Sequence, residues 1–162
     1  RIQGAEVAGR WGITEALSLR ANYTFTDSEQ LSGAQKGLPL TNTARHMANA
    51  SLNWQATDRF SMQLLAEARS KRYRDTINGV RRDYQDYTVL HLGAQYRFNE
   101  HVAVSGRINN LLDRDFTTYQ ATFTDLDGNG AYADGTNEVL FEDDYNNKDK
   151  ARSVWVSLNF RF

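Results

Sequence analysis

The sequence SVWVSLNFRF, at residues 153–162, alternates between apolar and polar side chains for most of its length. Its apolar set comprises Val154, Val156, Leu158, Phe160 and Phe162. The intervening positions hold mainly Ser, Asn and Arg. A β-strand gathers such alternate residues onto one side, whereas an α-helix would scatter them around its circumference. The stretch therefore predicts a strand with one apolar face and one polar face.

Six further stretches toward the N-terminus repeat this alternation. They cover approximately residues 2–13, 17–26, 48–54, 60–68, 90–98 and 102–108. Each is about as long as a tilted strand that crosses a bilayer. The short connections are residues 14–16, 57–59 and 99–101, and the long ones are residues 31–45, 74–83 and 112–149. Short periplasmic turns and long extracellular loops are typical of outer-membrane barrels. We therefore expect an all-β fold, a transmembrane antiparallel β-barrel.

The composition agrees with this fold class. The sequence holds no run of 18 apolar residues, which excludes a transmembrane helix, and barrel strands keep the mean hydropathy low. A formal net charge of -1 gives no overall attraction to nucleic acid, and the lack of cysteine excludes disulfides. Aromatic residues stand at the ends of the apolar bands, as membrane girdles require and a soluble sandwich does not. They are Trp11, Phe25, Trp54, Phe60, Tyr96, Phe98, Phe160 and Phe162.

Seven strands form an incomplete barrel. Bacterial single-chain barrels normally have an even number of strands, and an open sheet edge in lipid is very costly. We therefore expect further strands on the N-terminal side of this sequence.

Two motifs resemble those of TonB-dependent outer-membrane receptors. Residues 108–116, INNLLDRDF, resemble the "NLFDKxY" motif, which in that family lies at the top of the penultimate strand. A last extracellular loop, a "GR"-like pair and a final aromatic-ended strand then follow in the family. Ala151 and Arg152 occupy the place of the pair, although the glycine of "PGR" is absent. Pro39 and residues 40–46 resemble the loop-to-strand segment of these receptors. Within the family, the sequence resembles receptors for ferric catecholate siderophores, including the colicin I receptor type.

The resemblance implies a domain organisation and a function. Residues 1–162 would be the C-terminal part of the barrel, the last seven of about 22 strands. The plug and the earlier strands would lie outside this sequence, as would the TonB box. The function would be active transport of a ferric siderophore, without enzymatic activity and without a cofactor. The partners would be the siderophore, TonB, the barrel-assembly machinery, lipopolysaccharide, and colicins or phages, but not nucleic acid.

Basic residues around the second long connection are the candidate ligand contacts. The set comprises Tyr73 and five basic residues, Arg69, Lys71, Arg74, Arg81 and Arg82, and Arg72 is a further cation of the same connection. Cations at the mouth would concentrate an anionic ferric catecholate, and arginines would donate hydrogen bonds to its oxygens. Arg69, Lys71 and Tyr73 share the parity of Gln63 and Glu67, so we expect all three on the lumen face. The alternative is a belt that binds lipopolysaccharide or remains solvated.

The last long connection is acidic instead. Within it, Asp125, Asp127 and Asn129 resemble the front half of a calcium loop, because oxygen ligands alternate before a glycine turn. The twelfth position is Thr136 rather than a bidentate glutamate, so a solvated acidic turn is the alternative. His46, His91 and His101 lie in different segments and are not expected to form a metal site.

The C-terminal aromatic residues are candidates for a second role. Leu158, Phe160 and Phe162 resemble the signal read by the barrel-assembly machinery, since an alternating edge strand can add to another sheet edge. They would also contact lipid.

Two other function classes stay open at this point: a passive porin-like channel without a plug, and an outer-membrane barrel enzyme. The enzyme would need a Ser/His or Asp/His cluster, which this sequence does not show.

Overall fold

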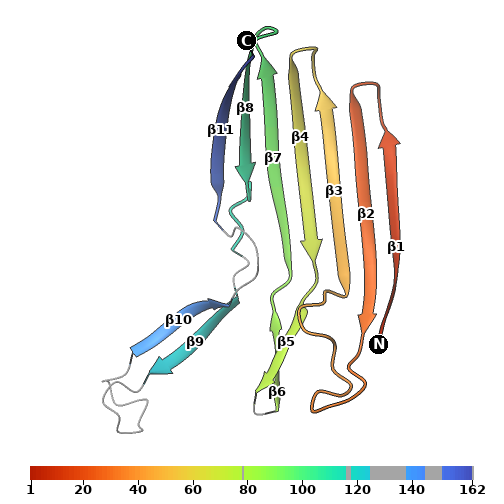
Figure 1. Cartoon of the computed structure of the whole chain (residues 1–162), viewed down its shortest axis with the longest axis vertical. Coiled ribbons are helices and arrows are strands. Elements are labelled where there is room, and N and C mark those ends of the chain that lie inside the picture. The colour runs from red at the N-terminus through yellow and green to blue at the C-terminus, as the bar shows by residue number, and fades with distance from the viewer. Residues whose placement is uncertain (78, 116–117, 125–137, 145–150, 162) are drawn as a thin grey trace. The chain divides into compact units, whose positions relative to one another are not determined.

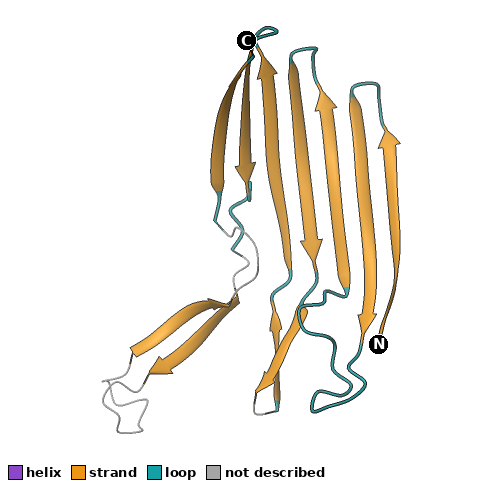
Figure 2. Cartoon of the chain, viewed as in Figure 1, coloured by secondary structure: helices purple, strands orange, loops and turns teal. Residues whose placement is uncertain are grey.

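The structure is a computed structural model of the chain. It describes residues 1–77, 79–115, 118–124, 138–144 and 151–161. The chain divides into two units, Arg1–Phe116 with Asp149–Phe162, and Thr117–Lys148. The regular elements of the described residues are all β-strands (Figure 2). No helix in this part of the chain has the length and apolar character needed to span a membrane.

The first unit contains a seven-stranded antiparallel sheet (Figure 1). Its strands are β1 (Ile2–Gly12), β2 (Leu17–Ser28), β3 (His46–Gln55), β4 (Phe60–Arg69), β7 (Tyr87–Arg97), β8 (Val102–Asn109) and β11 (Ser153–Phe160). They lie in the order β1-β2-β3-β4-β7-β8-β11. The seven strands predicted from alternation are therefore confirmed, and they are arranged as a barrel wall would be.

The register separates two faces of the sheet. One row across the strands comprises Leu19, Leu52, Leu64, Leu92 and Ile108, and we call its side the apolar face. The neighbouring row comprises Ser18, Asn53, Gln63, Gly93 and Arg107, and its side is the polar face. Polar side chains link across this second face, since Gln63 Nε2 donates to Asn53 Oδ1 at 2.8 Å.

The two ends of the sheet differ. At the short-turn end, backbone hydrogen bonds close the connections, for example from Ile13 N to Leu17 O at 2.9 Å and from Phe98 N to Val102 O at 3.0 Å. At the opposite, long-loop end, the second long connection contains a hairpin, β5 (Arg72–Ile77) and β6 (Val80–Tyr84). Gly79 allows its tight turn with a φ of 76°. The alternation did not predict this hairpin, because its residues are mostly charged.

Burial is concentrated at the long-loop end. The buried apolar side chains of the described residues are Ala44, Tyr73, Tyr87 and Val89. By contrast, Val156 on the apolar face is 74% exposed. A single-layer sheet buries a face only when a second layer or a lipid phase covers it. Among the described residues, no second layer covers the apolar face.

The second unit contains a separate two-stranded antiparallel sheet. Its strands are β9 (Thr118–Thr124) and β10 (Glu138–Asp144), paired from Thr118 with Asp144 to Thr124 with Glu138. This hairpin falls in the third long connection and was not predicted either. The candidate calcium ligands Asp125, Asp127 and Asn129 lie outside the described residues.

Candidate functional site

The candidate site lies at the long-loop end, where β4 passes into β5. Ser70 and Lys71 interrupt the strand between these two elements. The preceding long connection runs beside β5 and is tied to it by the backbone: Asn42 N donates to Tyr73 O at 2.8 Å, and Ala44 forms a bridge with Arg72. Loop and hairpin are therefore joined by backbone contacts at this end of the sheet.

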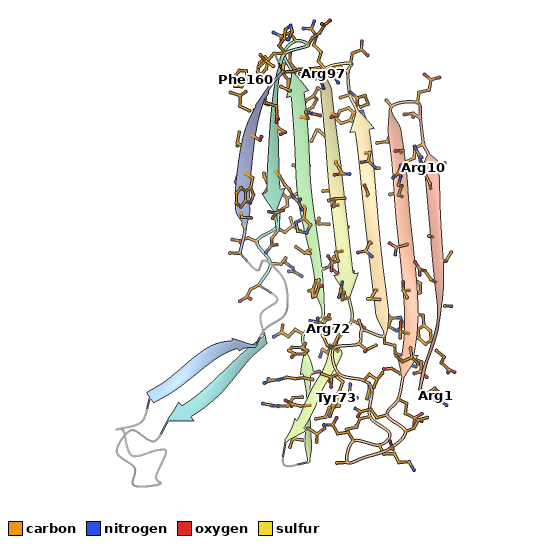
Figure 3. The ribbon with its side chains drawn as sticks, in the orientation of Figure 1. Arg1, Arg10, Arg72, Tyr73, Arg97 and Phe160 are labelled. Atoms are coloured by element: carbon orange, nitrogen blue, oxygen red, sulfur yellow. The ribbon has the colours of Figure 1, made fainter. Side chains whose placement is uncertain are left out.

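The interruption at residues 70–71 changes which side chains share a face. Arg69 lies on the polar face next to Glu67, but Lys71 and Tyr73 line a pocket with His46 of the apolar face. Arg72 is the residue that approaches Glu67 and Arg69. The common lumen face predicted for Arg69, Lys71 and Tyr73 is therefore wrong for the last two. Figure 3 labels Arg72 and Tyr73 at this end of the sheet.

Arg72 is the buried cation of the site. Only 2% of the residue is exposed, and its guanidinium lies 5.2 Å from the centre of the Tyr84 ring and 5.7 Å from that of Tyr87. Its Nη1 donates to Asn42 Oδ1 at 3.0 Å. Within the described residues, Nε and Nη2 have no hydrogen-bond partner. Burial lowers the pKa of Arg72 below its usual value, because it penalises the charged form. The two tyrosine rings offset part of this penalty through cation–π contacts.

Glu67 links β4 to β7 next to Arg72. Tyr87 Oη donates to Glu67 Oε1 at 2.8 Å, and Arg69 Nε lies 3.1 Å from the same oxygen. The register places Arg69 directly opposite Tyr87, so β4 and β7 bring the three side chains together. This carboxylate partly neutralises Arg69 and fixes the Tyr87 ring that covers Arg72.

A second carboxylate organises the hairpin. Both Asp75 oxygens accept hydrogen bonds from Arg82, and Arg74 Nε lies 3.4 Å from Asp75 Oδ2. These hydrogen bonds from Arg82 lower the pKa of Asp75. Arg74 also lies 6.0 Å from the centre of the Tyr84 ring, on which Arg72 stacks. Arg74 and Arg82 therefore lie near the Arg72 stack.

These side chains form one group, which we call the arginine–tyrosine cluster. It comprises Arg69, Arg72, Arg74, Arg82, Tyr84 and Tyr87. Four guanidinium groups share two carboxylates, Glu67 and Asp75, which leaves a surplus of positive charge. Guanidinium forks suit paired anionic oxygens, and the tyrosine rings suit an aromatic partner. Sequence analysis counted Arg72 among the cations of this connection but did not select it as a ligand contact, and it missed both tyrosines, because the shift in alternation at residues 70–71 is visible only in the structure.

The remaining candidates face the other way. Tyr73 is 1% exposed, its hydroxyl lies 3.0 Å from Thr76 Oγ1, and Arg81 stacks on its ring. Arg81 donates to Asp83 at 2.9 Å. Lys71 is exposed and has no ion-pair partner among the described residues. Tyr73 is therefore a packing residue of the hairpin, and Lys71 and Arg81 are available to the apolar-face side.

The motif at residues 108–116 has a structural role. Asn110 is fully buried with a φ of 47°, and its side chain accepts from Arg114 N and donates to Arg114 O, both at 3.0 Å. Asp113 Oδ1 accepts from Arg152 N at 3.1 Å. Asn110 therefore closes the turn after β8, and Asp113 ties this turn to Arg152, the residue before β11.

The other sequence candidates are spread over the sheet. Leu158 and Phe160 lie on the apolar face of β11, 55% and 60% exposed, while Phe162 is outside the described residues. The three histidines do not converge; His46 contacts Tyr23, His91 contacts Asn110, and His101 contacts Arg161. The described part of the chain holds no group of three side chains suited to a metal ion.

Comparison with known proteins points to one family of outer-membrane proteins. The profile described as "TonB dependent receptor-like, beta-barrel" matches residues 1–111. The iron-regulated outer membrane virulence protein of Vibrio cholerae is 32% identical over 114 residues, which is 69% of this chain. The ferric enterobactin receptor PirA of Pseudomonas aeruginosa is 29% identical over 109 residues, or 63% of the chain.

Solved structures share the fold. A mutant of the ferric enterobactin receptor of Pseudomonas aeruginosa superimposes with a TM-score of 0.69 at 22% identity, covering 99% of this chain and 22% of that one. The matches cover 18% of the Vibrio protein and 14% of PirA. The aligned segments therefore make up less than a fifth of the length of these two relatives, and this chain spans only part of them.

Proposed function

Because the chain belongs to the family of TonB-dependent receptor-like β-barrels, we propose that it forms part of an outer-membrane receptor that imports a ferric siderophore of the catecholate type. The apolar face would contact lipid and the polar face would line the barrel interior. The long-loop end would be extracellular and the short-turn end periplasmic.

The relatives support this substrate class. One is named for its regulation by iron, and another is named a ferric enterobactin receptor. A ferric tris-catecholate carries negative charge on oxygens bonded to aromatic rings. This chemistry requires cations and ring surfaces at the same place.

The arginine–tyrosine cluster is the observation that carries the assignment. It lies at the proposed extracellular mouth and on the proposed interior face, and its positive charge exceeds its negative charge. Arg69, Arg74 and Arg82 have side-chain exposures of 36%, 14% and 28%, so parts of their guanidinium groups are accessible. We assign ligand contact to these three residues. Lys71, Tyr73 and Arg81 are left out, because they lie on the other side of the hairpin.

Transport would require parts of the receptor beyond this chain. A plug inside the barrel would close the pore, and TonB would energise its rearrangement through an N-terminal segment. The barrel-assembly machinery would insert the protein, reading Leu158, Phe160 and Phe162. Colicins or phages are further expected ligands of the same exposed loops.

The binding of ferric enterobactin to the purified full-length receptor tests the ligand assignment. We expect Arg69→Ala, Arg74→Ala and Arg82→Ala each to weaken binding by about 1.5 to 3 kcal/mol, the usual value for a hydrogen bond to a charged group. The matched control is Arg59→Ala, which removes one exposed arginine from the short-turn end. Unchanged affinity in all three cluster variants would reject the assignment, provided that each variant still folds into a heat-modifiable barrel.

A further inference from the structure

The apolar face differs between its two halves. Toward the short-turn end it carries bulky side chains, including Leu19, Leu52, Leu64 and Leu92. Toward the long-loop end, β3 and β4 each carry alanine at two consecutive positions of this face, and β1 and β2 each add one small residue, whereas Val7, Tyr23 and Leu90 beside them are bulky. The small residues are Gly9, Ala21, Ala48, Ala50, Ala66 and Ala68. A hollow of about 570 Å³ lies over this half, and we call it the alanine hollow.

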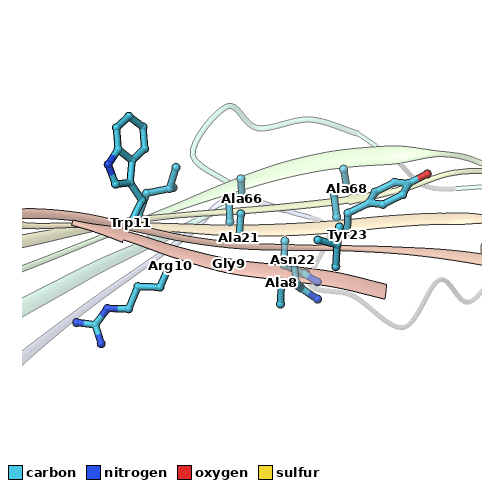
Figure 4. A pocket seen from close by; sticks show the side chains of 14 residues that line it. Ala8, Gly9, Arg10, Trp11, Ala21, Asn22, Tyr23, Ala66 and Ala68 are labelled. Carbon is cyan, nitrogen blue, oxygen red and sulfur yellow. The ribbon is translucent and has the colours of Figure 1, made fainter. Parts of the chain in front are cut away.

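Figure 4 shows the alanine hollow from close by. Trp11 and Arg10 leave β1 on opposite sides, and Ala21 and Ala66 lie on the Trp11 side. Tyr23 borders the hollow toward the long-loop end. The hollow is almost entirely apolar, and it is formed by strands β1 to β4 of this chain.

A polar pocket continues the hollow at the long-loop end of the sheet, and its lining combines Asp27 and His46 of the apolar-face parity with Thr26 and Ser28 of the polar-face parity. The register places Tyr23, Ala48 and Ala68 in one row of the hollow. One row further toward the long-loop end lie Phe25 and His46, and Ser70 N donates to His46 O. His46 and Ser70 line a cavity of about 480 Å³, which we call the rim pocket. The two cavities therefore meet where Tyr23 Oη hydrogen-bonds His46 Nδ1 at 2.7 Å.

The rim pocket carries cations that are only partly neutralised. Lys71 has no ion-pair partner among the described residues. The side chain of Arg45 is 64% exposed, and its Nη2 lies 3.8 Å from Asp27 Oδ1. Arg81 also lines the pocket, paired with Asp83. The lining carboxylates are Asp27 and Asp86. Lys71 and Arg45 are therefore the groups that could hold an anion.

The height of the rim pocket matches the membrane interface. Tyr23 and Phe25 stand at its edge toward the short-turn end. Aromatic residues of this kind sit at the headgroup level of a bilayer. An acyl chain in the hollow would lie over the methyl groups of the alanines, between the bulkier side chains of Trp11, Leu19 and Tyr23 that border the hollow. A phosphate on the long-loop side of the hollow would meet Lys71 and Arg45.

We propose that the rim pocket and the alanine hollow together form a binding site for lipopolysaccharide of the outer leaflet. The phosphorylated glucosamine headgroup would occupy the rim pocket, and an acyl chain would lie in the hollow. The site rests on the orientation of the barrel, with the long loops outside, and is independent of the siderophore. It gives Lys71 a function on the membrane side of the hairpin.

Lipid binding to the full-length receptor in detergent, measured by native mass spectrometry, tests this site. The probes are diphosphorylated lipid A, the same lipid without its phosphates, and phosphatidylglycerol. We expect Lys71→Ala and Arg45→Ala each to lower the affinity for diphosphorylated lipid A about fivefold. Removal of the phosphates should have a similar effect and should abolish the difference between these variants and the wild type.

A second pair of variants tests the acyl-chain half of the site. Gly9→Leu places a bulky side chain at the hollow, where a Cβ meets no atom within 4 Å, and it should lower the affinity for lipid A. Gly12→Leu is the control for a bulky substitution in β1 away from the hollow, since Gly12 is equally open but lies on the polar face at the short-turn end. Arg59→Ala is the control for charge.

Several results would overturn the lipid site. One is wild-type affinity for lipid A in Lys71→Ala, Arg45→Ala and Gly9→Leu. Another is equal binding of phosphatidylglycerol, which would indicate general attraction to anionic lipid. Only the folded, heat-modifiable fraction of each variant is compared, and no siderophore is present. A failure here is therefore distinct from a failure of the proposed transport function.

Discussion

Asp113 contacts Arg152 through both of its carboxylate oxygens. Oδ1 accepts a hydrogen bond from Arg152 N at 3.1 Å, and Oδ2 lies 3.4 Å from Arg152 Nη2. The two residues are 39 positions apart and stand on either side of the last long connection. The contact holds the start of this connection against its end, next to the paired strands β8 and β11.

The turn beside this contact should depend more on Asn110 than on Asp113. Asn110→Ala removes two side-chain hydrogen bonds from a fully buried position with a positive φ, and should lower the free energy of unfolding by about 2 to 3 kcal/mol. Asp113→Asn removes only an exposed ion pair and should cost less than about 1 kcal/mol. Urea unfolding of the refolded full-length receptor measures both. Equal losses would contradict this ranking.

Arg72 allows packing to be separated from charge. Arg72→Met keeps much of the side-chain volume between Tyr84 and Tyr87 but removes a buried guanidinium that has two nitrogens without partners. Replacing a poorly satisfied buried ion with an apolar side chain is often neutral. We therefore expect unfolding within about 1 kcal/mol of the wild type, but weaker binding of ferric enterobactin. Unfolding experiments and ligand titration of the same preparation provide the comparison.

Arg72→Ala is the contrasting variant. It empties the space between the two rings and should increase hydrogen exchange in residues 72–84. If Arg72→Met bound the siderophore as tightly as the wild type, the charge of Arg72 would have no part in recognition.

The hairpin should loosen in acid. Hydrogen bonds from Arg82 lower the pKa of Asp75 in the folded protein. Their stabilising contribution is therefore fully present above the unfolded pKa of aspartate, about 4, and is lost as the pH falls through the lower folded pKa. Limited proteolysis of the full-length receptor between neutral pH and pH values below about 4 should show cleavage in residues 72–84 only in acid. Asp75→Asn should be cleaved in this segment at neutral pH as well. A hairpin equally resistant at all these pH values would refute the role of Asp75.

The end of the chain should influence assembly. Phe160 is 60% exposed on the apolar face, opposite Val102, so it adds little packing within the described sheet. Deletion of Phe162, or Phe160→Ala, should slow insertion by the barrel-assembly machinery more than it destabilises the finished barrel. Pulse-chase analysis of the heat-modifiable form measures the rate. Wild-type kinetics in both variants would leave these residues with a lipid-contact role only.

The sequence predicted the sheet well, because alternation of period two is imposed on every strand by the two environments of its faces. Val154, Leu158 and Phe160 illustrate this in β11. The hairpins were missed for the same reason: β5 and β6 are short and charged, and their strands do not separate an apolar phase from a polar one. Charge alone could not predict which cations share a face.

The candidate site was therefore only partly predictable. Arg69, Arg74 and Arg82 were selected for their charge and lie in one cluster. Lys71 and Arg81 were selected on the same grounds and lie on the other side. The interruption at residues 70–71 causes this difference, and no residue there is a proline or glycine that would have indicated it. Tyr84, Tyr87 and Arg72 join the cluster through tertiary contacts alone.

Uptake of radioactive iron supplied as ferric enterobactin tests the central claim most directly. Cells that lack their other catecholate receptors would express the full-length protein, with or without TonB. We predict saturable uptake that requires TonB and is reduced when Arg69, Arg74 and Arg82 are replaced by alanine. Uptake that persists without TonB would instead indicate a passive channel, and a lack of uptake with TonB present would contradict the catecholate assignment.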